Sequence, residues 1–144
     1  MGEMANDVEV PTFKGEGTKA KVIFEELARL LPTHGEAIVS KVQAVFLFKV
    51  FNHGVYNRPT AQSQYAFWVL DLKNGSGTVR QTDKSEPCDL MFFGSDDNFE
   101  NIMTGLQNPP VEFFRGHFVA KGKSYLLAKL RELKPLHADI RAKL

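Results

Sequence analysis

Residue types that can carry out chemistry are present in this chain, but their spacing does not build a catalytic or metal-binding set. The four histidines lack the spacing of a metal site, and they are His34, His53, His117 and His137. The segment Gly122-Lys123-Ser124 resembles the end of a phosphate-binding loop, but that loop needs a glycine at position 117, and the nearest is Gly116. We interpret this segment as a turn between a strand and a helix.

Nucleophiles and paired carboxylates also lack partners. Cys88, the only cysteine, has no paired base in sequence, and no serine lies in a Gly-x-Ser-x-Gly turn. Asp96 and Asp97 form an acidic pair, which favours the positive end of a helix dipole. The sequence therefore predicts a protein that is not an enzyme, with no catalytic residue, no metal and no cofactor.

The composition indicates a globular domain rich in phenylalanine. Of the 16 aromatic residues, 12 are Phe, which adds apolar area without a polar group to satisfy. The net charge is +1 and no basic run occurs, so we expect no nucleic-acid partner. A single cysteine excludes an internal disulfide, and the first 20 residues contain no apolar segment typical of a secretory signal.

The periodicity of apolar residues predicts segregated helices and strands. The expected strands span residues 42–51, 64–73, 77–82, 89–94 and 117–121. The expected helices span residues 18–31, 35–41, 95–105, 109–114 and 124–134, with Pro32 and Pro135 as stops. This order predicts an α+β fold, a five-stranded mixed sheet covered on one face by about five helices. We expect a flexible arm over residues 1–17, a folded domain over 18–136 and a free tail over 137–144.

The last three residues resemble a targeting signal rather than a structural element. Ala142-Lys143-Leu144 is similar to the terminal Ser-Lys-Leu that the peroxisomal import receptor recognises. This pattern predicts a peroxisomal protein with a cytoplasmic pool. The alternative is an unconstrained basic tail.

Taken together, several segments resemble the sterol-carrier-protein-2 domain family. The resemblance covers about residues 13–133 and is carried by Phe46-Leu47-Phe48-Lys49-Val50, Trp68-Val69-Leu70-Asp71-Leu72-Lys73-Asn74-Gly75, Ser95-Asp96-Asp97-Asn98-Phe99, Met103-Thr104-Gly105, Asn108-Pro109, Phe113-Phe114-Arg115-Gly116, Ala120-Lys121-Gly122 and Leu127-Ala128-Lys129-Leu130. The resemblance implies an apolar tunnel between sheet and helices. It also implies binding and transfer of sterols, fatty acids, fatty acyl-CoAs or phospholipids by a monomer that contacts membranes transiently.

The apolar residues of these segments are the candidate lipid-binding residues. They are Phe46, Phe48, Trp68, Leu70, Phe92, Phe99, Ile102, Met103, Phe113, Phe114, Leu126, Leu127 and Leu130. The leucine-rich terminal helix is the expected lid, although one apolar stripe serves core packing equally well. Arg115, Lys121 and Lys123 are candidates for headgroup contacts. The alternative function is a module with a filled cavity that presents substrates to peroxisomal enzymes.

Overall fold

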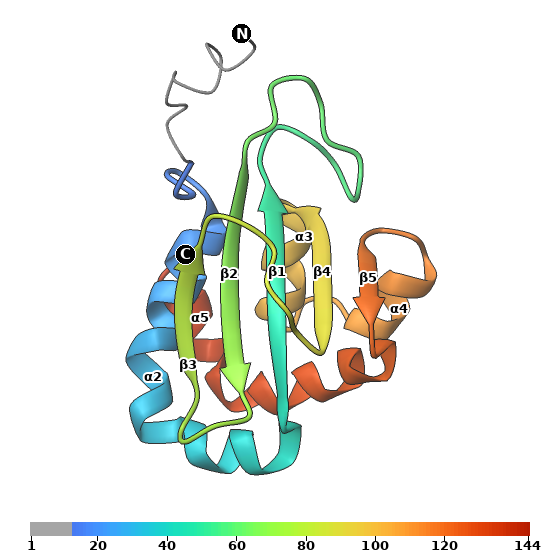
Figure 1. Cartoon of the computed structure of the whole chain (residues 1–144). Helices are drawn as coiled ribbons and strands as arrows, with labels where there is room; N and C mark the ends of the chain where they lie inside the picture. Colours follow the sequence, from blue (N-terminus) through green and yellow to red (C-terminus); the bar gives the residue numbers. More distant parts are fainter. Residues whose placement is uncertain (1–12) are drawn as a thin grey trace, which may run out of the picture.

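Five strands form one mixed sheet, and the helices lie on one side of it (Figure 1). The computed structural model describes residues 13–144. The strands are β1 (Ala44–Phe51), β2 (Tyr65–Leu72), β3 (Thr78–Thr82), β4 (Leu90–Ser95) and β5 (Val119–Gly122), in the order β3-β2-β1-β4-β5. Strands β1 and β4 are parallel, and every other neighbouring pair is antiparallel. The predicted α+β fold and five-stranded mixed sheet are confirmed.

The helical layer consists of segments of very different length. They are α2 (Lys19–Val42), α3 (Asp96–Met103), α4 (Pro109–Phe114), the 3₁₀ helix η1 (Ser124–Leu136) and α5 (His137–Ala142). The first three begin at side-chain caps, because Thr18, Ser95 and Asn108 each accept a backbone N–H of the first turn. None of the helices formed by residues 13–144 has the length and apolar character needed to cross a membrane.

The expected break at Pro32 is wrong, because α2 runs through it for 24 residues. Pro32 and Ala28, whose carbonyl loses its helical donor, are both on the exposed side of the helix. Water can satisfy that carbonyl, so burial of the opposite face keeps the helix continuous. Helix α2 ends at Gln43, whose left-handed backbone (φ 53°) places its N–H on the Val39 carbonyl.

Both chain ends of the domain are more ordered than predicted. Residues 1–12 of the expected arm lie outside the described residues, but residues 13–17 are not free, because Phe13 packs on the core and the Lys14 carbonyl accepts from the Gln81 amide at 2.9 Å. Pro135 does not end the last helix, and the expected free tail forms α5 with Ile140 fully buried. The prediction of a free tail is therefore wrong for residues 137–142.

The core lies between α2 and the helix-facing side of the sheet. Phe48 on β1 is paired with Trp68 on one side and Phe92 on the other. Phe24 of α2 stacks on Trp68 with a centroid distance of 4.8 Å and on Phe99 of α3 at 5.0 Å. Contacts of this kind add specific aromatic attraction to the burial of apolar area. They fix the long helix over the β2–β3 side of the sheet (Figure 1).

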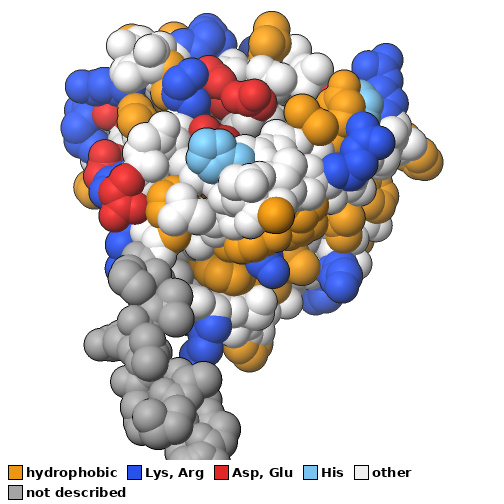
Figure 2. Space-filling model, turned by 90° about the horizontal axis from the view of Figure 1, so that it is seen from above, with side chains coloured by type: hydrophobic (Ala, Val, Ile, Leu, Met, Phe, Trp, Pro, Cys, Tyr) orange, Lys and Arg blue, Asp and Glu red, His pale blue; other side chains and the backbone are white. Residues whose placement is uncertain are grey.

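The other face of the sheet has no helix over it (Figure 1). Here the Lys49 ammonium lies 5.0, 5.5 and 5.3 Å from the ring centroids of Tyr65, Phe67 and Phe93. Hydrophobic side chains reach the surface as a band in the view from above (Figure 2). The cation over three rings gives this half-buried face a polar centre.

The closest approach of α2 to the sheet depends on Gly35. A Cβ atom at this position would lie 1.6 Å from the backbone oxygen of Ser76, in the β2–β3 turn. We expect Gly35→Ala to lower the free energy of unfolding by about 3 kcal/mol, because the whole helix must move away from the turn. Chemical denaturation measures this loss.

The neighbouring substitution Glu36→Ala is the control for that experiment. Glu36 is exposed on the same helix, so its replacement should change the free energy of unfolding by less than about 0.5 kcal/mol. Equal stability of Gly35→Ala and the control would show that the close approach is not needed.

Candidate ligand-binding site

Most of the predicted lipid-binding residues meet in one apolar interior between the sheet and the helices. Eleven of the thirteen are at most 4% exposed, namely Phe46, Phe48, Trp68, Leu70, Phe92, Phe99, Ile102, Met103, Leu126, Leu127 and Leu130. Phe113 is partly buried and packs against the same cluster. Their convergence from β1, β2, β4, α3 and η1 is what the sheet topology requires. Their use by a ligand stays a prediction.

The interior is closely filled with aromatic rings at its centre. Phe48 contacts Phe99 with a centroid distance of 5.2 Å, and Phe92 contacts Phe118 at 4.7 Å. Rings at these distances leave no room for a hydrocarbon chain between them. A ligand that enters this interior must displace side chains, so the mobile part of the cover decides whether binding is possible.

The helix η1 is the part of the cover best suited to move. Its buried residues Leu127, Leu130, Leu133 and Leu136 are spaced by three, which aligns them on one face of a helix with three residues per turn. This spacing explains why the segment is a 3₁₀ helix rather than the expected α-helix. Such helices have poorer hydrogen-bond geometry, and long ones are uncommon. The segment therefore covers the core with weak backbone support.

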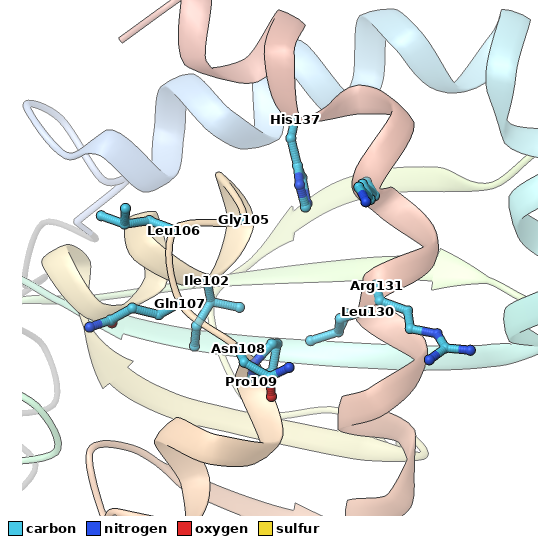
Figure 3. Close-up of a pocket in the computed structure, with 10 residues that line it drawn as sticks. Ile102, Gly105, Leu106, Gln107, Asn108, Pro109, Leu130, Arg131 and His137 are labelled. Atoms are coloured by element: carbon cyan, nitrogen blue, oxygen red, sulfur yellow. The ribbon is translucent and has the colours of Figure 1, made fainter.

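Two pockets open along the seam between η1 and the α3–α4 region. The first, of about 370 Å³, is lined by Ile102, Gly105, Leu106, Gln107, Asn108, Pro109, Leu130, Arg131, Lys134 and His137. Figure 3 shows Leu130 pointing toward Ile102 across this pocket, with His137 reaching toward it from the start of α5. Its floor is thus buried and apolar. We call it the basic pocket, because Arg131, Lys134 and His137 lie on one wall.

The polar wall of the basic pocket suits a ligand with an anionic or hydrogen-bonding end. Arg131 lies at the outer rim, where its guanidinium points away from Leu130 (Figure 3), lies 3.8 Å from Glu132 and keeps 83% of its accessible surface. Gln107 also lines this pocket, but its side chain points away from Leu130 and His137 (Figure 3) and borders a neighbouring pocket with Asn98 and Asn101.

The second pocket, of about 360 Å³, is lined by Pro110, Phe113, Phe114, Ser124, Tyr125, Leu127 and Ala128. We call it the aromatic pocket. Here the prediction for Phe114 needs correction, because this side chain is 89% exposed and lies at the rim rather than in the interior. Adjacent residues of an α-helix point about 100° apart, so Phe113 and Phe114 face in different directions, and only Phe113 packs against the core.

Helix α4 is anchored by a buried carboxylate that sequence reasoning missed. Glu112 is 2% exposed, and its Oε1 lies 2.6 Å from Nδ1 of His117, while Oε2 lies 3.4 Å from Arg115. The His117 ring stacks on Tyr56 of the β1–β2 loop with a centroid distance of 3.9 Å. A buried acid is stabilised only by such partners, so this cluster fixes the position of α4 beside β5.

Sequence reasoning also missed the wall of the basic pocket. Arg131, Lys134 and His137 belong to a segment expected to be a solvated helix end and a free tail. Within residues 13–144, no group of three or more His, Cys, Asp or Glu side chains is arranged to hold a metal ion. Cys88 is half-buried, and burial raises the pKa of its thiol, which keeps it in the less reactive protonated form.

Fold and pockets together define a class of protein, an α+β domain whose apolar interior opens along a helical seam. The SCP-2 sterol transfer family matches residues 24–134, and the chain belongs to this family.

Relatives and solved structures of the same type are similar over most of this chain. It is 35% identical to sterol carrier protein 2 of Homo sapiens over 127 residues, 87% of this chain and 22% of the human protein. It is 31% identical to peroxisomal multifunctional enzyme type 2 of Mus musculus over 132 residues, 92% of this chain and 17% of that enzyme. The chain therefore spans about a fifth of the length of these curated relatives.

The solved structures confirm the fold. The sterol carrier protein domain 2 of Helicoverpa armigera, 25% identical, superposes with a TM-score of 0.65 over 90% of this chain and 96% of that one. Sterol carrier protein 2 of Aedes aegypti in complex with palmitate, 20% identical, has a TM-score of 0.53 over 88% and 96% of the two chains.

The burial of His137 predicts how stability depends on pH. Burial lowers the pKa of this imidazole below its usual 6.5, and the charges of Arg141 and Lys134 act in the same direction. Above pH 6.5 the ring is neutral in both the folded and the unfolded chain. As the pH falls through 6.5, only the unfolded chain takes up the proton readily, so the free energy of unfolding decreases.

Denaturation at about pH 7 and at about pH 5 tests this assignment. The wild type should lose more stability on acidification than His137→Gln, whose amide does not titrate in this range. All other titratable groups are the same in both proteins, so their contributions to the change in stability cancel in the comparison. An equal loss in the two proteins contradicts the role given to His137.

Proposed function

We propose that this protein binds a single lipid without chemical conversion and transfers it between membranes. In this proposal the hydrocarbon chain enters the apolar interior under η1, and a polar end stays at the basic pocket. One observation carries the proposal: the buried apolar residues Ile102 and Leu130 share a pocket with Arg131, Lys134 and His137. A basic wall beside an apolar floor matches a molecule with an anionic head and an apolar tail.

The energetics agree with a carrier that opens for its ligand. Burial of apolar area is worth roughly 25 cal/mol per Å², so a long hydrocarbon chain can offset the displacement of a weakly supported helix. The volume of the basic pocket, about 370 Å³, lies at the low end of the range typical for ligand sites. It fits the head and the first part of a chain, and outward movement of η1 would lengthen it.

The relatives support the same class of ligand. The Aedes aegypti protein with this fold holds palmitate, a fatty acid with one carboxylate and one alkyl chain. The raised pKa of the Cys88 thiol supports a role without catalysis, because it leaves the only cysteine poorly nucleophilic.

Titration of delipidated protein with a fluorescent fatty acid tests lipid binding. We expect saturable binding to the wild type at micromolar concentration. The double substitution Arg131→Gln and Lys134→Gln should weaken it about tenfold, because two cations near the carboxylate are lost.

Two controls make the result specific. A fatty alcohol of equal chain length should bind the wild type and the double variant equally, because it carries no charge. Lys84→Gln, an exposed change in the β3–β4 loop, should leave fatty-acid affinity unchanged. Absence of saturable binding to the wild type would overturn the proposal. An unchanged affinity of the double variant would show that the carboxylate of the ligand does not lie at the basic pocket.

We further propose that Ala142-Lys143-Leu144 directs the protein to peroxisomes. The similarity to a peroxisomal multifunctional enzyme supports this compartment. The backbone N–H of Leu144 donates to the Arg141 carbonyl at 3.1 Å, and the Leu144 side chain is 41% exposed beside α2. A receptor that binds the three residues in extended form must therefore unwind the last turn of the chain.

Deletion of Leu144 tests the targeting signal. A fluorescent protein fused ahead of residue 1, with the chain ending at Leu144, should give a punctate peroxisomal pattern that becomes diffuse after the deletion. Asp139→Asn, an exposed change in α5, serves as the control and should keep the punctate pattern. A punctate pattern that survives the deletion would refute the assignment.

A further inference from the structure

Large apolar side chains are exposed together around the aromatic pocket. Val111 is 44% exposed, Phe114 89% and Tyr125 67%. Phe114 and Tyr125 line the same pocket from α4 and η1, and Val111 precedes Phe114 by one helical turn. A cluster of this kind on a soluble domain marks a surface that is covered when the protein functions.

The chain around this cluster is strongly basic, although the whole protein carries a net charge of only +1. Residues 105–131 contain five Lys or Arg residues and one acid, Glu112. That acid is buried and bonded to His117, so it does not project from the surface. The basic residues nearest to the exposed aromatics along the chain are Arg115, Lys121 and Lys123. Lys121 lies on edge strand β5 and alternates with the core-facing Ala120, so it is on the helix-free face of that edge.

These three cations remain accessible to a partner. Arg115 lies 3.4 Å from the buried Glu112 and Lys123 lies 3.5 Å from Asp89, yet their side chains keep 63% and 59% of their accessible surface. Lys121 is exposed at the end of β5. The two other cations of the segment point elsewhere, since Lys129 donates to the Lys41 carbonyl and Arg131 lies at the basic pocket.

We propose that Val111, Phe114, Arg115, Lys121, Lys123 and Tyr125 form a docking surface for an anionic membrane. This inference rests on the proposed lipid-carrier function. Exposed aromatic side chains enter the interfacial region of a bilayer, and neighbouring Lys and Arg residues pair with anionic headgroups. A second copy of the chain fits this surface poorly, because it would bring like charges together.

The docking surface also surrounds a pocket that reaches the apolar interior. The aromatic pocket lies inside it, and its lining includes Leu127, which is 2% exposed, and Phe113, which packs against the core. Helix α4, β5 and the start of η1 lie next to one another at one edge of the molecule (Figure 1). A hydrocarbon chain that leaves a docked membrane here would meet apolar side chains without crossing water.

Tryptophan fluorescence of Phe114→Trp tests the docking directly. The native Trp68 is 4% exposed, so its emission should change little. On addition of vesicles made of equal parts phosphatidylcholine and phosphatidylserine, the emission of Phe114→Trp should shift to shorter wavelength, and brominated lipids should quench it. Lys84→Trp, an exposed residue in the β3–β4 loop, is the matched control and should show neither change.

Co-sedimentation with the same vesicles measures the affinity. Phe114→Ser should weaken vesicle binding about tenfold, because an inserted aromatic ring is lost. Lys121→Gln should weaken it about fivefold, the loss expected for one cation near an anionic surface, while Lys84→Gln should not. Vesicles of phosphatidylcholine alone should bind the wild type more weakly than the mixed vesicles.

The outcomes separate docking from lipid binding. The sequence made Lys121 a candidate for headgroup contacts, but it lines neither the basic nor the aromatic pocket. Lys121→Gln should therefore bind fatty acid in vesicle-free solution like the wild type, so the two proposals can fail independently. The docking proposal is overturned if the wild type does not sediment with mixed vesicles, or if it does while Phe114→Trp shows no shift. Dimerisation without vesicles that disappears in Phe114→Ser would assign the surface to a second copy instead.

Discussion

The structure depends on the contact between α2 and the helix-facing side of the sheet. Phe24 stacks on both Trp68 and Phe99, and Gly35 lets the same helix approach the Ser76 carbonyl. Because this long helix is fixed at two places, half of the apolar interior has a rigid cover. The other half is covered by α4 and η1, which are short or poorly hydrogen-bonded, so any opening of the interior is confined to their seam.

The sequence was sufficient for the sheet and most helices, because their signals are local. Runs of β-branched and aromatic residues mark β1 and β2, and capping residues such as Ser95 and Asn108 mark the starts of α3 and α4. The predictions that the structure corrects concern a proline inside a helix and the two ends of the domain. Pro32 was expected to break a helix that tertiary packing keeps intact. Residues 137–142 were expected to be free, although Ile140 is fully buried and the Arg141 guanidinium donates to the Thr104 carbonyl at 2.7 Å.

The candidate site was predictable only in its apolar part. Ile102 and Leu130 follow from the stripes of their helices, but Arg131, Lys134 and His137 carry no periodic signal that separates a pocket wall from a solvated surface. Their grouping opposite the α3–α4 connection is a property of the folded chain. Phe114 shows the converse case, because two adjacent aromatics suggest a buried pair, while the short helix turns one of them outward.

The leucine spacing of η1 ties the closed cover to 3₁₀ geometry. Residues spaced by three align in a 3₁₀ helix, whereas each such step in an α-helix rotates the side chain by about 60°. From Leu127 to Leu136 there are three steps, so conversion to an α-helix would move the last leucine to the side opposite the first. The closed cover thus requires the less stable helix type. Relaxation toward the α-helix would withdraw leucines from the core, which is the space that an incoming hydrocarbon chain would fill.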